Sequence, residues 1–371
     1  MKVLHLCSYY YGSTLYDNLV KSLDELDIEQ EVYIPVIKGL KLDIQNFSKC
    51  NFIVKETYGS VDRAFFYKKY KQNLKGLVDS TDINKVDIIH AHTLFTNGVI
   101  AYNLKKEKGI PYIVAVRNSD VNTFFKYFIH LRKLGVNILK EAEKVIFISP
   151  AYLENTIEKY VPEKYRKEIR EKSLVIPNGV NSYWIENKGE VRKVSDKLKL
   201  VYAGEITENK NVHKVIRDVK DMNDKGIAVN YTIIGEGPYK EKVESLIKEL
   251  SAEAYITFLP RINDKKLLRE KYKENDVFVM TSTFETFGLS YIEALSQGVP
   301  VLYTKNQGID GFFKEGRVGF AVPLGESIQN YIMKIKDNYE EMSKNAIEIV
   351  DDFNWKSIGK KYNEIYKDIS K

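Results

Sequence analysis

The stretch TSTFETFGLSYIEALSQGVPV (residues 281–301) leads from a buried strand through a turn into a short helix. It follows the apolar run DVFVM (276–280), and the helix is expected to begin at about Gly288. Gly298 suits the position just past a helix end, and Pro300 prevents the helix from continuing. A defined helix directly after a buried strand is typical of an α/β domain with a parallel sheet.

The start of this helix has the features of an anion site. The backbone N–H groups of Phe287, Gly288 and Leu289 have no partner within the helix and lie at the positive end of its dipole. Gly288 carries no side chain that would obstruct a close approach. These features suit a diphosphate group.

Two carboxylates flank the helix start. Glu285 precedes it and Glu293 lies two turns into it, so one can reach past the start while the other lies beside the first turns. Carboxylates accept two hydrogen bonds at once from vicinal hydroxyls, such as those of a sugar or a ribose. The alternative interpretation is a pair of solvated helix glutamates.

Short apolar runs alternate with longer amphipathic stretches along the whole chain, which predicts parallel strands buried between helices. A polar segment at 187–197 separates two series of runs and is interpreted as a linker. We therefore expect two doubly wound domains, 1–190 and 191–371. The runs are VLHLCSY, EVYIPVI, VDIIHAH, PYIVAVR and KVIFIS in the first series, and LKLVYAG, NYTIIGEG, YITFLP, DVFVMTS and VPVLYT in the second.

Composition limits the class of protein. Of the 371 residues 44% are hydrophobic and 29% charged, as in ordinary globular proteins, and the net charge of +6 lacks the density of a nucleic-acid binder. Cys7 and Cys50 have neither metal nor redox spacing, which fits a reducing cytoplasm. The opening MKVLHLCSYYYG predicts a first strand rather than a leader, and no apolar stretch approaches the roughly 18 residues that a membrane span needs.

The string E-T-F-G-L-S-Y-I-E-A-L-S-Q-G-V-P-V (285–301) resembles the E-x7-E signature of glycosyltransferase family 4, of the bacterial polysaccharide and glycolipid type. This resemblance implies a GT-B fold, in which two Rossmann-like domains face each other across a cleft. The N-terminal domain would bind the acceptor and the C-terminal domain a nucleotide-sugar. The amphipathic tail helix at 352–371 would cross back to the N-terminal domain.

The resemblance also implies roles for residues of the second domain. Glu285 would face the donor sugar, Glu293 would hold the ribose hydroxyls, and the amides of residues 287–289 would contact sugar and diphosphate. Lys210, after the strand that ends in Gly204, would neutralise the diphosphate. The family usually has arginine where this chain has Glu205, so one positive charge is missing. The remaining donor-binding candidates are Gly204, Glu205, Gly235 and Ile262, the last of which lies in the loop FLPRIN. For Gly235 and Gly237 the alternative is that they only form a turn.

The first domain departs further from the family. In AVRNSD (115–120), Arg117 and Asn118 replace the usual histidine and glycine, while Asp120 remains. Arg117 cannot act as a base, but it could stabilise a departing phosphate or an acidic acceptor. Arg117 and Asp120 are therefore candidate catalytic residues. The candidate acceptor-side residues are Gly12, Ser13, His92 and Asn118, with core or turn histidines as the alternative for His90 and His92.

The implied reaction is retaining transfer, with a UDP-sugar favoured as donor and a saccharide or lipid-linked saccharide as acceptor. In the usual front-face proposal the leaving phosphate takes the acceptor proton, so the protein supplies positioning and charge. No D-x-D is placed as a metal site, and neither a metal nor another cofactor is expected. The alternatives are a catalytically degenerate binding subunit, favoured by Glu205 and Arg117, and a nucleotide-sugar epimerase or a phosphorylase on the same fold.

An aromatic stripe beside basic residues suggests contact with a membrane. Phe124, Phe125, Phe128, Ile129 and Leu131 alternate with Lys126, His130, Arg132 and Lys133. Such a stripe can seat a helix in an anionic headgroup layer, which predicts peripheral binding to the inner face of the plasma membrane. The alternative is that these side chains pack inside the domain.

Overall fold

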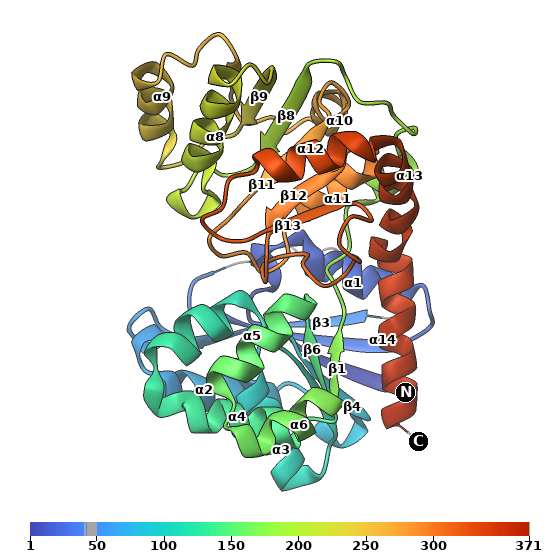
Figure 1. Cartoon of the computed structure of the whole chain (residues 1–371). Helices are drawn as coiled ribbons and strands as arrows, with labels where there is room; N and C mark the ends of the chain where they lie inside the picture. The colour runs from blue at the N-terminus through green and yellow to red at the C-terminus, as the bar shows by residue number, and fades with distance from the viewer. Residues whose placement is uncertain (41, 43–49, 371) are drawn as a thin grey trace. The chain divides into compact units, whose positions relative to one another are not determined.

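A computed structural model describes residues 1–40, 42 and 50–370, and the chain divides into two compact units (Figure 1). The first unit comprises Met1–Ile148, Leu153–Gly179 and Trp355–Lys371. The second comprises Ser149–Tyr152 and Val180–Asn354. The units thus divide at 179–180, whereas the sequence placed the change of domain at 190–191.

The first unit contains a seven-stranded sheet in the order β3-β2-β1-β4-β5-β6-β7, and every pair of neighbours is parallel. The central strands are buried on both faces, as their apolar runs predict. The strands are β1 (Lys2–Leu6), β2 (Glu29–Ile37), β3 (Cys50–Tyr58), β4 (Ile88–Ala91), β5 (Tyr112–Ala115), β6 (Lys144–Phe147) and β7 (Ser173–Val175). The helices of these residues are α1 (Thr14–Asp24), α2 (Phe66–Val78), α3 (Gly98–Lys108), α4 (Arg132–Glu141), α6 (Glu163–Glu171) and α14 (Trp355–Ile369), with α5 (Pro150–Tyr160) running from one unit into the other.

The second unit contains a six-stranded sheet in the order β10-β9-β8-β11-β12-β13, again parallel throughout. Two parallel α/β units confirm the predicted fold class. The strands are β8 (Leu198–Ala203), β9 (Val229–Ile234), β10 (Ile256–Leu259), β11 (Val277–Met280), β12 (Val301–Thr304) and β13 (Gly319–Val322). The helices are α7 (Ser182–Glu186), α8 (Val212–Asp224), α9 (Lys240–Glu249), α10 (Lys265–Lys273), α11 (Leu289–Ser296), α12 (Gln329–Asp337) and α13 (Tyr339–Ile349).

The helix predicted after Gly288 is confirmed as α11. It ends at Ser296, and Gly298 follows in the left-handed region with φ of +70°, as expected of a residue just past a helix end. Gly298 also lies tightly packed, because a Cβ there would approach Ser343 Oγ to 2.7 Å. The glycine therefore serves both the turn and the packing behind it.

The predicted tail helix is confirmed as α14, and it belongs to the first unit. Its apolar residues recur at three- and four-residue steps, and they join the core that β1 and α1 form (Figure 1). The helix approaches that core closely at Gly359, where a Cβ would lie 2.7 Å from Ser22 Oγ. The buried residues that α14 contributes are Ile358, Tyr362, Ile365 and Tyr366.

Three strands, β3, β7 and β13, have no counterpart among the predicted runs. All three lie at sheet edges, where one neighbour is missing. In β3 every residue except Tyr58 is exposed or half-buried, β7 has three residues, and β13 opens with a glycine. An edge strand need not be apolar on both faces, so the run pattern that marks central strands can miss it, although the pattern did detect the edge strand β10 in the run YITFLP.

The segment 187–197, interpreted as a linker, contains no helix or strand at 188–195 but is attached to the second unit. The N–H of Gly189 donates to the Ser296 carbonyl at 2.8 Å, and the Ser195 hydroxyl donates to buried Asp276 at 2.9 Å. Its polar composition therefore reflects hydrogen bonds to its own unit. Across residues 1–40, 42 and 50–370, no helix has the length and hydropathy of a membrane span.

Three histidines lie together in the first unit's core. His5 of β1 pairs with His90 of β4, and His92 follows two residues later on the same strand face. His5 Nδ1 lies 3.1 Å from His92 Nε2, and His90 Nδ1 lies 2.7 Å from the Tyr366 hydroxyl. Burial lowers the pKa of His5 to about 3, and it lowers the pKa of His90 and of His92 well below the ordinary value.

These histidines predict acid-sensitive folding. Their folded-state pKa values lie below the unfolded value near 6.5, so the stability they permit is complete above that pH and declines as pH falls below it. At pH 5.5, keeping each of these histidines neutral in the folded state lowers the free energy of unfolding by about 1.4 kcal/mol. His92→Asn should therefore reduce the loss of unfolding free energy between pH 7.5 and 5.5 by about that amount, as measured by urea unfolding. The exposed His130, changed to Asn as a control, should leave the loss unaltered; equal behaviour of the two variants would contradict the assignment.

Candidate functional site

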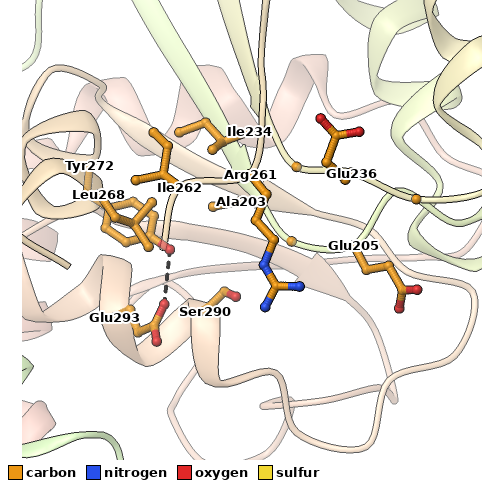
Figure 2. Close-up of a pocket in the computed structure, with 13 residues that line it drawn as sticks. Ala203, Glu205, Ile234, Glu236, Arg261, Ile262, Leu268, Tyr272, Ser290 and Glu293 are labelled. Atoms are coloured by element: carbon orange, nitrogen blue, oxygen red, sulfur yellow. Dashed lines mark hydrogen bonds between the residues drawn. The ribbon is translucent and has the colours of Figure 1, made fainter. Parts of the chain in front are cut away.

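The second unit has a pocket of about 630 Å³ at the carboxyl ends of β8, β9 and β10, beside the first turns of α11 (Figure 2). In open parallel sheets, ligands bind at this edge. The lining residues are Ala203, Gly204, Glu205, Ile234, Gly235, Glu236, Gly237, Arg261, Ile262, Leu268, Tyr272, Ser290 and Glu293. Five residues predicted to bind the donor are among them: Gly204, Glu205, Gly235, Ile262 and Glu293.

Glycines bring the strand ends close enough to form this pocket. A Cβ on Gly235 would lie 1.9 Å from the Gly204 carbonyl oxygen. A Cβ on Gly237, whose φ is +158°, would lie 2.3 Å from the Ile206 carbonyl oxygen. The two predictions for Gly235 are therefore compatible, because the residue permits the backbone approach and also lines the pocket.

Glu293 faces the pocket from α11. Its carboxylate accepts a hydrogen bond from the buried Tyr272 hydroxyl at 3.2 Å (Figure 2). Burial raises the pKa of Glu293 to about 7, although the Tyr272 hydrogen bond opposes the shift. A carboxylate with this pKa changes its charge within the physiological pH range.

Lys210 and Glu285, which are far apart in the sequence, are brought together. The Lys210 ammonium lies 2.6 Å from Glu285 Oε2, with 22% and 11% of the side chains exposed. The two loops are also joined through Asn209, whose side chain donates to the Phe284 carbonyl at 2.8 Å and accepts from the Phe284 N–H at 3.0 Å. The other Glu285 oxygen accepts from the Thr286 N–H at 3.1 Å.

The start of α11 has the predicted donor geometry. Gly288 precedes the helix with φ of +86°, and a Cβ there would lie 2.5 Å from the Tyr291 ring. Within the described part of the chain, no side chain caps this helix start. The backbone N–H groups of Phe287, Gly288 and Leu289 are therefore available to a ligand, beside the Lys210–Glu285 pair.

Arg261 is a pocket residue that the sequence reasoning missed. It is exposed, and Figure 2 shows its guanidinium extending toward the side of the pocket where Ser290 and Glu205 lie. Among the described residues, none forms a hydrogen bond or ion pair with it. The available signal was its position directly before Ile262, in the loop FLPRIN. Leu268, Tyr272 and Ser290 were also missed, and they have no motif that would distinguish them from ordinary helix residues.

Arg117 and Asp120 belong to the first unit. Asp120 is fully buried and accepts backbone N–H groups from Leu94, Phe95 and Arg117 at 2.9–3.0 Å. Burial raises the pKa of Asp120 to about 6, against those hydrogen bonds. This carboxylate holds the loop backbone. Arg117 is half-buried and donates through Nη1 to Asn178 Oδ1 at 3.2 Å.

The four predicted acceptor-side residues lie in different surroundings. Gly12 and Asn118 are exposed, and the side-chain oxygen of Asn118 accepts a hydrogen bond from the side-chain amide of Asn122. Ser13 caps α1 by accepting the Leu15 N–H at 3.3 Å. His92 is buried in the histidine cluster, which corresponds to the core alternative.

His5, His90 and His92 also present ring nitrogens within 4.8 Å of one another, a spacing at which three histidines could hold a metal ion. Each histidine has one engaged ring nitrogen, since His5 bonds to His92 and His90 to Tyr366, and one ring nitrogen that has no partner among the described residues. The rings of His90 and His92 are stacked at 3.9 Å. These bonds and the stacking join the three histidines to one another and to α14 in the core of the first unit, which corresponds to the core alternative for His90 and His92.

Comparison with known proteins agrees with this arrangement. Residues 12–183 match the family described as Glycosyltransferase Family 4, and residues 185–351 match the one described as Glycosyl transferases group 1. An alpha-monoglucosyldiacylglycerol synthase of Acholeplasma laidlawii is 27% identical over 306 residues, which cover 76% of this chain and 73% of the relative.

Two solved structures show the same fold. Sucrose-phosphate synthase of Thermosynechococcus elongatus superimposes with a TM-score of 0.75 at 17% identity, covering 100% of this chain and 99% of the other. Anabaena HepE in complex with UDP-glucose gives a TM-score of 0.67 at 17% identity, with coverage of 99% and 100%. With a family 4 domain followed by a group 1 domain on two parallel-sheet units, the chain belongs to the GT-B glycosyltransferases, enzymes that act on nucleotide sugars.

Proposed function

We propose that this protein transfers a sugar with retention from a nucleotide-diphosphate sugar, UDP-sugar favoured, to a saccharide or lipid-linked acceptor. The observation that carries the proposal is the Lys210–Glu285 pair beside the uncapped start of α11. It combines a cation and backbone amides for a diphosphate with a carboxylate for sugar hydroxyls. Uridine is favoured as the base because HepE, of the same fold, was solved with UDP-glucose.

In the proposed reaction, the bond from the anomeric carbon to the phosphate oxygen breaks, and the acceptor oxygen bonds to that carbon on the same face. The acceptor proton passes to the departing phosphate. Lys210 and the α11 amides stabilise the charge that develops on the diphosphate, while Glu285 orients the sugar. These groups supply the charge stabilisation themselves, so we propose a reaction that requires no metal.

Arg261 offers a replacement for the cation that is missing at Glu205. Both residues line the same pocket, and the guanidinium has no competing partner among the described residues. Arginine binds phosphate through a planar fork of donors that remains charged at any working pH. We therefore assign Arg261 to the diphosphate.

Glu285→Gln should strongly reduce transfer and leave the fold intact, because it keeps the side-chain volume and removes the charge. Losing this contact in the transition state should cost about 2–4 kcal/mol of activation free energy. The measurement is the rate at which nucleoside diphosphate is released in the presence of an acceptor. An unchanged rate would show that Glu285 is not in the reaction centre.

Arg261→Ala should weaken UDP binding and make the remaining binding less sensitive to salt, because one cation–phosphate contact is lost. Titrations at low and high salt measure both effects. Lys266→Ala, at an exposed residue of α10 outside the pocket lining, is the matched control and should change neither. An Arg261→Ala protein with unaltered affinity for UDP would remove this residue from the site.

The affinity for UDP-glucose should fall as pH decreases below about 7, because protonated Glu293 is a weaker acceptor for the ribose hydroxyls. The decline should approach tenfold per pH unit and level off above pH 7. UDP-glucose is the suitable ligand because it lacks a terminal phosphate that titrates in this range. Glu293→Gln should bind with a flat pH profile; a profile that still bends near pH 7 would assign the titration to another group.

A further inference from the structure

The first unit has a pocket of about 420 Å³ that none of the predicted acceptor-side residues lines. Segments that follow β1, β4 and β5, together with the end of β3, contribute to it, so it lies at the ligand-binding edge of the sheet. Its lining residues are Ser8, Tyr9, Tyr11, Tyr58, Ala64, Phe66, Lys69, Tyr70, Asn73, Thr96, Ser119, Thr123, Phe124 and Phe128.

Aromatic rings dominate this lining. Phe66 of α2 contacts Phe124 with ring centres 5.8 Å apart, and Phe124 contacts Phe128 at 5.5 Å. A continuous row of rings thus connects α2 with the segment before α4. Walls of this kind favour ligands with apolar surface, because removing such surface from water is the main source of affinity in ring-lined pockets.

One buried polar group in the lining lacks a partner. The Asn73 side chain is fully buried, and its carbonyl oxygen accepts from the Thr57 hydroxyl at 2.6 Å. Its Nδ2 has no hydrogen-bond partner among the described residues. A buried donor is costly to leave unsatisfied, so the pocket should receive an oxygen as well as hydrocarbon.

Exposed apolar side chains adjoin the ring residues in sequence. Phe65 and Tyr67 flank Phe66 and are 56% and 52% exposed, while Ile129 follows Phe128 and is 67% exposed. Val61 and Tyr127 are also exposed. We call these five residues the apolar rim. Exposed apolar clusters of this kind on a protein surface mark contact with a membrane or another protein.

The aromatic stripe in the sequence is divided by the structure. Phe125 and Leu131 are buried, as the packing alternative expected, whereas Phe128 and Ile129 are exposed, as the membrane interpretation expected. The membrane prediction therefore rests on part of that stripe together with residues 61–67, which the sequence analysis did not identify.

Positive charge accompanies the rim. Residues 65–75 contain four lysines, Lys68, Lys69, Lys71 and Lys75, and no acidic residue, although Lys68 forms an ion pair with the preceding Asp62 at 2.8 Å. Residues 121–139 add Lys126, Arg132 and Lys133, again without an acidic residue. Basic residues beside exposed apolar groups complement an anionic lipid surface.

We propose that the pocket binds an amphiphilic acceptor, with its hydrocarbon among the rings and an oxygen accepting from Asn73 Nδ2, while the apolar rim lies in an anionic lipid surface. This proposal rests on the proposed glycosyl transfer and names the class of acceptor. A free saccharide would account for a few rings, but it would leave the exposed rim and its lysines without a role.

Octyl and methyl β-glucoside test the pocket, because they share one sugar and differ in hydrocarbon. Titrations below the micelle concentration should show at least tenfold tighter binding of octyl glucoside. Ala64→Trp and Thr123→Trp each fill the pocket from an exposed lining residue. Each should weaken the binding of octyl glucoside at least tenfold. Ala254→Trp, at an exposed alanine of the second unit, is the matched control and should leave the binding of octyl glucoside unchanged.

Equal affinity for the two glucosides would overturn the proposal in favour of a saccharide pocket. Absence of octyl glucoside binding, or binding that neither tryptophan variant weakens, would overturn it outright. UDP binding to the same samples reports on the second unit separately. If UDP does not bind the unmodified protein, the proposed donor site is wrong, whatever the glucosides show.

Vesicle sedimentation tests the rim. The protein should bind phosphatidylcholine vesicles that contain phosphatidylglycerol, bind pure phosphatidylcholine weakly, and dissociate as salt is raised. Phe65→Ser combined with Ile129→Ser should reduce binding at least tenfold. Leu267→Ser combined with Leu324→Ser changes exposed leucines of the second unit and should have no effect. Equal losses in the two double variants, or binding indifferent to lipid charge, would contradict the assignment of this surface.

Discussion

The ion pair between Lys210 and Glu285 is the interaction on which the second unit's site depends. It joins the loop after β8 to the loop after β11, and Asn209 reinforces the same junction with backbone hydrogen bonds. Withdrawing opposite charges from water carries a desolvation cost that their attraction barely offsets, so such a pair adds little to stability. Its position directly before an uncapped helix start is better explained by binding. A diphosphate there would meet an oriented cation, and a sugar would meet a carboxylate held in place.

Backbone geometry completes the site. Gly204, Gly235 and Gly237 let the ends of β8 and β9 approach so closely that any side chain would collide with a carbonyl or ring. Gly288 does the same for the first turn of α11. The pocket walls are thus formed largely by main chain, and specificity falls to the few side chains that project from them. Glu293 and Arg261 are two of these, one with a pKa near neutrality and one with a permanent positive charge.

The sequence predicted those helices and strands whose position is determined by neighbouring residues in the chain. Runs buried on both faces marked the central strands, and Gly298 followed by Pro300 marked the end of α11. The edge strand β3 escaped detection because its residues are mostly exposed or half-buried and leave no continuous apolar run, whereas β7 and β13 have only three and four residues. In the site, Glu285 and Glu293 were found through their spacing around a helix start. Arg261 and Tyr272 were not, because their importance arises from strands and helices that meet only in the folded unit.

The two units differ in how much the sequence revealed. The motif in the second unit carries the charge and geometry to which we assign a nucleotide diphosphate, and such a group imposes the same demands wherever it binds. The first unit's pocket is lined by aromatic residues from segments that lie far apart in the sequence, and aromatic residues in a sequence more often indicate an ordinary core. Only their assembly around one cavity, with lysines beside them, supports the ligand surface that we propose.

The central claim is that Lys210 binds the donor's diphosphate. Titration of UDP and of uridine into the unmodified protein and into Lys210→Ala tests it directly, since the two ligands share a base and a ribose. The account predicts that the variant binds UDP at least tenfold more weakly and binds uridine almost unchanged. Equal losses for UDP and uridine, or no loss of UDP affinity, would contradict it.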